Sequence, residues 1–242
     1  MGGCRLSKRW SILAWILLFG AFLMIDRAPN TVAAVQSPTP LVVIDPGHGG
    51  WDPGAVRGSV YEKRITLDVG LKLGTLLQQR GYRVYYTRQN DRALSNTVMR
   101  DLTQRAVLAN NLGAALFVTV HVNSEPTGSM AGPIVYYNPV SPSSYQLARA
   151  VSKSLAPAVG LVHAPRPIRQ WVLRVARMPA INVEIGFITH RTDARRLQQA
   201  WYQNLLAQSI ANGISRYDSA TALALMRPAL LLALANPFDP WS

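Results

Sequence analysis

The sequence has a single cysteine, Cys4, among 242 residues, and no internal repeat. A lone cysteine excludes disulfides within the chain. Because Cys4 precedes the first apolar run, it also argues against a cysteine-based metal site or a thiol nucleophile. Apolar residues make up 49% of the chain, so a sizeable core can form without covalent cross-links. The length favours one domain of about 180 residues with terminal extensions.

Long apolar runs without charge are also scarce, and the clearest one lies near the amino terminus. Arg5, Lys8 and Arg9 precede the apolar residues 10–25. Basic residues followed by such a run are typical of a secretory signal, although its length lies between a signal core and a full membrane span. Residues 1–34 are therefore predicted to be a signal peptide, cleaved near Val32-Ala33-Ala34, or a membrane anchor. Either predicts export to the periplasm or cell envelope.

Acidic residues are few: 12 Asp and Glu stand against 25 Lys and Arg, which gives a net charge of +13. A basic exported protein indicates an anionic partner, such as a cell-wall polymer or a membrane surface. Nucleic acid is the competing interpretation. We expect no nucleic-acid binding, because the basic residues are scattered along the chain and no stacking-aromatic motif accompanies them.

After a linker over residues 35–40, strand-like and helix-like patterns alternate up to residue 218. This alternation predicts an α/β fold, with a mainly parallel, twisted sheet of about six strands and helices on both faces, in a single domain. The apolar tail over residues 219–242 is too short and too interrupted to span a bilayer, so it packs on the domain or lies on a membrane surface. The predicted strands are 41–44, 82–87, 116–120, 134–137, 171–175 and 180–183, and the predicted helices are 65–79, 102–113, 145–155 and 202–214.

Glutamate and histidine are so rare that their positions are informative. His48, His121 and Glu184 each follow a predicted strand, and Glu62 opens the first long helix. Ligands and catalytic groups of open parallel sheets collect beyond the carboxyl ends of the strands. These four side chains are therefore predicted to share one rim of the sheet. The remaining residues of these types lie in polar loops and are expected at the surface: His163, His190 and Glu125.

Two imidazoles and one carboxylate form a catalytic zinc set, which leaves a fourth position for water. Zinc lowers the pKa of that water to about 7, and a separate carboxylate must then move its proton. The glycines beside His48 (Gly47, Gly49 and Gly50) allow a tight turn and close approach to a ligand. On spacing alone, a metal site and two structural histidines are about equally well supported.

Four groups of residues then carry a resemblance to a known family. In order along residues 40–217, they are Val43–Gly50 with Asp52–Ala55, then Glu62, then Arg88, Asp91 and 105–110 leading to Thr119–Asn123, and finally Val172–Arg174, Met178–Ala180 and Val183–Phe187. These motifs resemble those of the bacterial zinc-dependent N-acetylmuramoyl-L-alanine amidases, which include cell-separation amidases and sporulation autolysins. The chain departs from the usual pattern at Thr119-Val120, at Val122 and at Thr189-His190.

The resemblance implies one zinc ion held by His48, Glu62 and His121, with Glu184 as general base and then general acid. It implies cleavage of the peptidoglycan amide that joins N-acetylmuramic acid to the L-alanine of the stem peptide. Substrate contacts are assigned to Arg174 and, on the same basis, to Asn123. Some relatives carry a plugging helix where this chain has only the short loop 123–134, so we expect an open cleft. Nothing in the sequence indicates an oligomer, so we expect a monomer.

Two other functions stay open at this point. A zinc peptidase that cuts within the stem peptide would use the same metal set, and only the resemblance favours the sugar–peptide bond. A non-catalytic wall-binding protein is the alternative of a different class. The presence of all three ligand candidates and of Glu184 argues against it.

Overall fold

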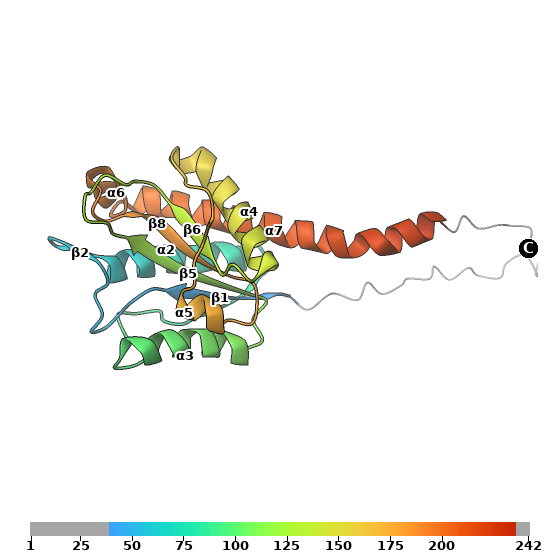
Figure 1. Cartoon of the computed structure of the whole chain (residues 1–242), viewed down its shortest axis with the longest axis horizontal. Coiled ribbons are helices and arrows are strands. Elements are labelled where there is room, and N and C mark those ends of the chain that lie inside the picture. Colours follow the sequence, from blue (N-terminus) through green and yellow to red (C-terminus); the bar gives the residue numbers. More distant parts are fainter. Residues whose placement is uncertain (1–38, 236–242) are drawn as a thin grey trace, which may run out of the picture. The chain divides into compact units, whose positions relative to one another are not determined.

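The computed structural model describes residues 39–235, with side chains described through Ala224. The predicted signal peptide or anchor over residues 1–34 lies outside the described residues, as do most of the linker and the last part of the apolar tail. The described residues fold around one central sheet, drawn in Figure 1.

The central sheet has six strands in the order β4-β1-β5-β8-β6-β7. Neighbouring strands are parallel except β6 and β8, which pair antiparallel. This confirms the predicted mainly parallel sheet of about six strands. The strands are β1 (Leu41–Pro46), β4 (Arg83–Tyr86), β5 (Leu116–Asn123), β6 (Ile134–Tyr137), β7 (Arg166–Pro167) and β8 (Ala180–Phe187), and a separate hairpin joins β2 (Val56–Arg57) to β3 (Val60–Tyr61).

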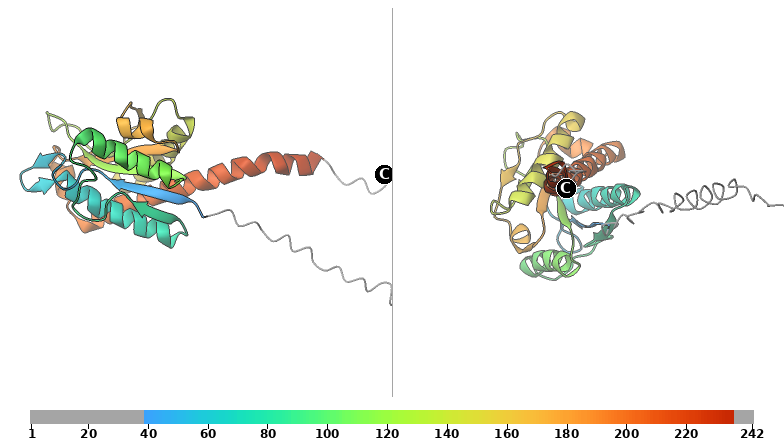
Figure 2. Two further views of the ribbon diagram at one scale, coloured as in Figure 1. Left: turned by 90° about the horizontal axis from the view of Figure 1, so that it is seen from below. Right: turned by 90° about the vertical axis from the view of Figure 1, so that its right-hand side faces the viewer.

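Helices lie on both faces of the sheet, as Figure 2 shows. The larger apolar cluster joins one face of the sheet to α2 (Glu62–Gln79), α4 (Pro142–Val159) and α7 (Ala200–Ala235). A smaller cluster joins the other face to α3 (Val98–Asn111) and α5 (Trp171–Val175). The short helix α6 (Arg191–Arg196) follows β8. The predicted helices on both faces are therefore confirmed.

The prediction of a strand over residues 171–175 was wrong, because this segment forms the helix α5. A short apolar run does not by itself distinguish a strand from a helix. The segment packs on α3 instead of joining the sheet: the indole N–H of Trp171 donates to Thr103 Oγ1 (2.9 Å), and Asn110 Nδ2 donates to the carbonyl of Val175 (2.9 Å). The sixth strand is β7, which has no apolar run to reveal it.

Strands β5 and β8 run further than their apolar segments suggested, so His121 and Glu184 lie inside strands rather than after them. Along β5, Val118, Val120 and Val122 point into the larger cluster. Because side chains alternate along a strand, His121 points to the opposite face, on the side of α3 and α5.

The last helix also differs in extent from its prediction. The apolar spacing predicted a helix over 202–214, whereas α7 begins at Ala200 and continues to Ala235. The first part of the predicted tail is thus a continuation of this helix. Among the described residues, no helix is long and apolar enough to cross a membrane.

Candidate metal centre

The metal centre forms where three parallel strands end side by side. His121 on β5 and Glu184 on β8 are direct partners in the parallel register, so their side chains share one face of the sheet. His48 follows β1, which pairs with β5 on its other side. Glu62 is the first residue of α2, the helix that returns from this end of the sheet.

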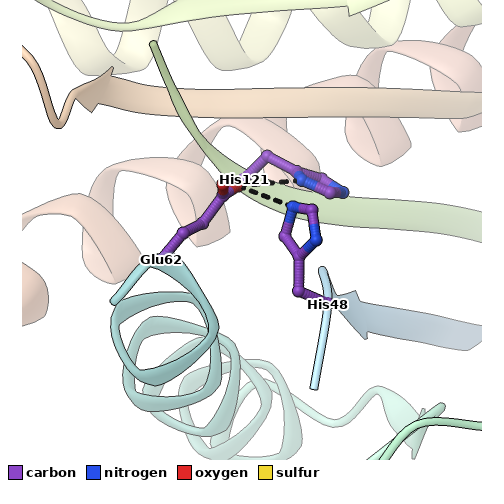
Figure 3. A group of neighbouring side chains, drawn as sticks. All are labelled: His48, Glu62 and His121. Atoms are coloured by element: carbon purple, nitrogen blue, oxygen red, sulfur yellow. Dashed lines mark hydrogen bonds and ion pairs between the residues drawn. The ribbon is translucent and has the colours of Figure 1, made fainter. Parts of the chain in front are cut away.

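His48, Glu62 and His121 point toward one another, as drawn in Figure 3. Glu62 Oε1 lies 3.1 Å from His48 Nε2 and 3.0 Å from His121 Nδ1. One potential ligand atom from each of the three residues lies within 4.8 Å of the others. Two imidazole nitrogens and one carboxylate oxygen at this spacing are a donor set that suits zinc, and only part of a tetrahedral shell is used.

Backbone groups hold the Glu62 carboxylate in place. Its Oε1 accepts a hydrogen bond from the N–H of Val122 (2.9 Å), and its Oε2 accepts one from the N–H of Ala55 (2.8 Å). Burial alone would raise the pKa of Glu62. Hydrogen bonds and charge interactions with His121 and His48 outweigh that effect and hold the pKa well below its ordinary value. The residue is therefore an anion that attracts positive charge.

Two glycines make room for the ligands. A Cβ at Gly47 would lie 2.3 Å from the imidazole of His121, so only glycine leaves space for that ring. Gly54 has a φ of +66°, and a Cβ there would lie 2.7 Å from Glu62 Oε2. Glycine is therefore required at Gly54 by both the backbone conformation and the close approach.

Asp52 orients His48 from outside the ligand set. Its Oδ2 lies 2.8 Å from His48 Nδ1, and its Oδ1 accepts a hydrogen bond from the N–H of Gly54 (3.0 Å). A carboxylate on one ring nitrogen directs the other nitrogen toward the metal position. Burial would lower the pKa of His48, but the contacts with Glu62 and Asp52 outweigh it and raise the pKa to about 9.

Glu184 is the buried carboxylate beside this set, with 8% of its surface exposed. Asn182 Nδ2 donates to its Oε1 (3.0 Å) and also to Gln170 Oε1 (3.1 Å). Glu184 Oε2 and Asn182 Oδ1 are the only buried side-chain polar atoms without a hydrogen-bond partner among the described residues. Burial is the main cause that raises the pKa of Glu184, to about 6. A carboxyl that titrates there can accept and release a proton near neutral pH.

Two buried arginines support the loop that carries His48. Arg105 lies on α3 and forms ion pairs with Asp45 and Asp101. It also donates to the carbonyls of Pro46 and His48, each at 2.8 Å. Burial alone would raise the pKa of Asp45, but the charge of Arg105 and hydrogen bonds hold it below its ordinary value.

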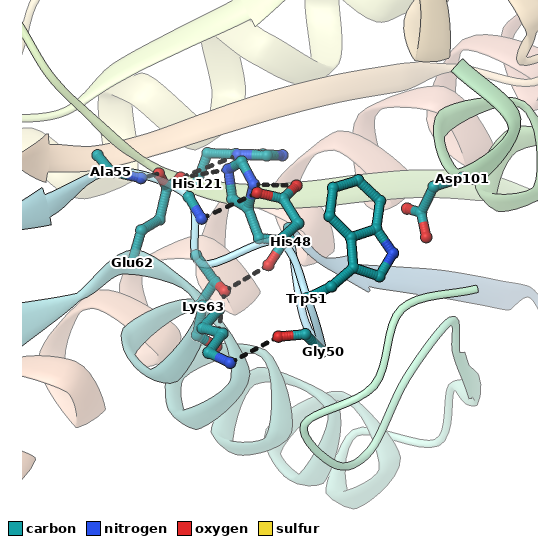
Figure 4. Close-up of polar contacts among 12 residues, drawn as sticks. His48, Gly50, Trp51, Ala55, Glu62, Lys63, Asp101 and His121 are labelled. Atoms are coloured by element: carbon teal, nitrogen blue, oxygen red, sulfur yellow. Dashed lines mark hydrogen bonds and ion pairs between the residues drawn. The ribbon is translucent and has the colours of Figure 1, made fainter. Parts of the chain in front are cut away.

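Arg88 supports the same loop from β4's side of the sheet. Its guanidinium donates to the carbonyls of Pro46 (2.9 Å), Gly47 (2.9 Å) and Lys63 (2.7 Å). Lys63 also donates to the carbonyl of Gly50 (2.8 Å), part of the contact set drawn in Figure 4. The loop after β1 is thus joined to α2, to the segment after β4 and to α3.

The centre opens into a small cavity of about 120 Å³, lined by His48, Asp52, Val98, Asp101, Leu102, Arg105 and His121. Trp51 stands beside it in Figure 4 and is 51% exposed. The indole N–H of Trp51 donates to the carbonyl of Ser95 (2.7 Å), which fixes the ring at the surface. The loop between β5 and β6, residues 124–133, contains turns and no helix.

The two residues that the resemblance assigns to substrate contact differ in their position relative to the metal centre. Asn123 ends β5, two residues beyond His121, and its side-chain oxygen accepts a hydrogen bond from the N–H of Ser124 (2.8 Å). Arg174 is exposed on α5 and stacks over Trp171, with its guanidinium carbon 5.6 Å from the ring centroid. It lines a different cavity, together with Asn138, Val140 and Arg169.

The other rare residues stabilise local structure away from the centre. His163 is half-buried, with its Nε2 2.9 Å from the carbonyl oxygen of Ala131. His190 caps α6, where its Nδ1 accepts from the N–H of Asp193 (3.4 Å). Glu125 lies in the β5–β6 loop and accepts hydrogen bonds from Thr127 and Met130.

Sequence reasoning did not assign a role to Asp52 or to Asn182. Asp52 follows His48 by four residues within the first motif, and that spacing was the available signal. Asn182 precedes Glu184 by two residues, so the two share a face of β8. Their contacts depend on how the loop after β1 folds and on which side chains meet beside β8.

Comparisons with known proteins agree on one family. Residues 42–216 match the family model described as N-acetylmuramoyl-L-alanine amidase. The chain is 32% identical over 205 residues to the N-acetylmuramoyl-L-alanine amidase LytC of Bacillus subtilis, which is 81% of this chain and 40% of LytC. It is 30% identical over 189 residues to the germination-specific amidase of the same organism, which is 73% of this chain and 79% of that protein. The chain thus spans less than half the length of LytC.

Solved structures have the same fold. The catalytic domain of the amidase CwlV from Bacillus (Paenibacillus) polymyxa var. colistinus superposes with a TM-score of 0.69 at 35% identity, covering 75% of this chain and 99% of that one. The amidase AmiC2 of Nostoc punctiforme superposes with a TM-score of 0.67 at 36% identity, covering 74% and 97% of the two chains.

Proposed function

The chain belongs to the N-acetylmuramoyl-L-alanine amidase family, and we propose that it acts on peptidoglycan as a zinc-dependent amidase with Glu184 as its proton-transfer group. Members of this family are hydrolases of the amide that joins N-acetylmuramic acid to L-alanine. His48, Glu62 and His121 would hold the zinc ion, for which their convergent nitrogen and oxygen atoms are a suitable donor set. When bound there, zinc supplies Lewis-acid polarisation of a carbonyl and a water of lowered pKa.

The observation that carries this proposal is the buried Glu184 beside the ligand set. Its Oε2 has no hydrogen-bond partner among the described residues, while Asn182 donates to its Oε1. An unpartnered carboxylate oxygen in a buried site is costly for stability, so a function for that oxygen explains its position. Its raised pKa, about 6, suits an alternation between base and acid near neutral pH.

The roles of the chain's own residues follow from this arrangement. Glu184 takes a proton from the water whose oxygen adds to the lactyl carbonyl carbon. The same carboxyl then gives its proton to the departing nitrogen as the C–N bond breaks. The products are a lactyl carboxylate on the sugar and a stem peptide with a free L-alanine amine. Asp52 keeps the imidazole of His48 in one orientation throughout.

Export to the cell envelope is part of the proposal, because peptidoglycan lies there and residues 1–34 carry the signal-like pattern. Asn123 is a candidate substrate contact, since it lies on β5 two residues beyond His121. Arg174 is a weaker candidate, because the cavity that it lines does not include the three ligands. The cleft is proposed to be open without an activator, since the β5–β6 loop contains no helix.

The test is digestion of purified peptidoglycan by the full chain in mild detergent, with analysis of the soluble products by mass spectrometry. We expect stem peptides that begin at L-alanine, loss of this product with a chelator, and recovery with zinc. Shortened peptides still linked to sugar would instead identify a zinc peptidase. Binding to the wall without any product, even after addition of cell extract, would identify a non-catalytic protein.

A further inference from the structure

The end of the sheet opposite the metal centre is where the described chain begins and where α7 leaves the domain, as Figures 1 and 2 show. Pro40, just before β1, lines one cavity together with Ser215, Asp218 and Ser219 of α7. The apolar residues 10–25 precede β1 in the sequence. The described part of the domain therefore begins at the same end from which α7 departs.

Directly after Asp218, the described side chains of α7 lie outside the packed core. Residues 219–224 are all exposed, and Leu223 is 63% exposed. From Ser219 to Ala235 the only ionisable residue is Arg227. An exposed apolar surface of this kind marks a protein or membrane interaction site.

A groove between α4 and α7 lies beside this exposed part of the helix. Its volume is about 480 Å³, and its apolar lining includes Ala150, Ala220 and Ala224. Three cations also line it, namely Arg149, Lys153 and Arg216, and no acidic residue with a described side chain does. None of these cations takes part in the ion pairs found among the residues with described side chains.

An apolar helix next to unpaired cations is the signature of a surface that lies on an anionic membrane. We propose that this end of the domain docks on a bilayer that contains anionic phospholipid. The exposed part of α7 inserts at the interface, and the three groove cations bind the lipid phosphates. The cations contribute charge complementarity, while the apolar helix surface favours a bilayer over a soluble polyanion.

The orientation that follows would serve the proposed function. The metal centre lies at the carboxyl ends of the strands, and the docking surface lies at their amino ends. A domain docked in this way presents its cleft away from the bilayer. The membrane contact itself does not depend on the amidase activity, so either proposal can fail without the other.

The experiment measures the polarity around α7 in the full chain. Leu223→Cys in a Cys4→Ser background provides one site for a polarity-sensitive fluorophore, titrated with vesicles of phosphatidylcholine alone or mixed with phosphatidylglycerol. We expect a blue shift on the mixed vesicles at much lower lipid concentration than on phosphatidylcholine. Replacing all three groove cations with glutamine (Arg149→Gln, Lys153→Gln and Arg216→Gln) should weaken the apparent lipid affinity about 100-fold.

A charge-matched control removes three exposed cations from α6, close to the other end of the sheet, as Arg191→Gln, Arg195→Gln and Arg196→Gln. We expect this variant to change the titration by less than about threefold, because screening weakens charges that lie beyond a Debye length from the lipid. The proposal is overturned if the fluorophore at position 223 shows no blue shift, or if both kinds of vesicle produce the shift at the same lipid concentration. It is also overturned if the two triple variants lose lipid affinity to the same extent.

Discussion

Two clusters of buried polar groups meet at the carboxyl end of the parallel strands, and they differ in how many of their polar atoms have hydrogen-bond partners. In the arginine cluster, Arg105 joins Asp45 and Asp101, and Arg88 donates to four backbone carbonyls. No buried side-chain polar atom in that cluster lacks a partner. In the metal centre, Glu184 Oε2 and Asn182 Oδ1 lack partners among the described residues.

This difference indicates that the arginine cluster supports the fold, whereas the metal centre carries the chemistry. A buried polar network that is fully hydrogen-bonded specifies one geometry, because any other arrangement leaves charges unpaired. A buried carboxylate oxygen without a partner reduces stability and remains available to a substrate or a water molecule. Substitutions in the arginine cluster should therefore lower the stability of the fold. Substitution of Glu184 should leave stability largely intact but abolish activity.

The largest expected effect is on activity, from Glu184→Gln. The amide keeps the size of the side chain but cannot accept a proton, so amide hydrolysis should fall by about 10²–10⁴-fold. Zinc content should remain unchanged, because Glu184 is not among the three converging ligands. Release of free stem peptides, followed by mass spectrometry, measures the activity. The matched control is Glu125→Gln in the exposed loop, and equal activity of the two variants would remove Glu184 from the reaction.

The next effect is on stability, from Arg105→Leu. Removal of this guanidinium leaves Asp45 and Asp101 as buried charges without their partner, which should cost about 3–5 kcal/mol in the free energy of unfolding. Urea denaturation measures it, with Arg100→Leu on the exposed side of α3 as control. Adding Asp45→Asn and Asp101→Asn should recover part of the loss. If the single variant unfolds like the control, the arginine cluster does not support the fold.

A smaller effect is expected at the boundary of the two clusters, from Asp52→Asn. The neutral amide should hold the imidazole of His48 less firmly and reduce its basicity, which should weaken zinc affinity about 10–100-fold. Competition with a chromogenic chelator measures the affinity, and Asp68→Asn on the exposed face of α2 is the control. Unchanged affinity would show that Asp52 has no part in orienting the ligand.

The smallest effect is the pH dependence of stability in metal-free protein. Burial raises the pKa of Glu184 from 4.5 to about 6. A raised acid pKa contributes stability that is fully present below about pH 4.5 and is lost as pH rises through about 6. Glutamine mimics the protonated acid. The free energy of unfolding of Glu184→Gln should therefore be about 2 kcal/mol above that of the parent at about pH 8, and equal to it at about pH 4.

Chemical denaturation in the presence of a chelator measures this last difference. A constant gap between variant and parent across the pH range would assign the effect to packing and not to titration.

The features that could be predicted from the sequence were those that depend on local residue patterns. Apolar runs and helical spacing identified the main strands and helices, and the rare His48, His121, Glu62 and Glu184 marked one rim. Prediction failed where local pattern is ambiguous, as for α5, whose short apolar run suits a helix or a strand. It also failed for β7, where Arg166 and Pro167 pair with β6 without any apolar signal.

The sequence by itself determined the fold class, the residue types at the rim and the family likeness, because each depends on order and spacing along the chain. Only the tertiary structure decided that Asp52 orients His48, that Asn182 holds Glu184 and that Arg105 joins α3 to the loop after β1. Hydrogen bonds and burial depend on which atoms meet after the sheet has formed. The unpartnered oxygen of Glu184 and the cation-lined groove beside α7 arise in the same way, from contacts between segments that are distant in the sequence.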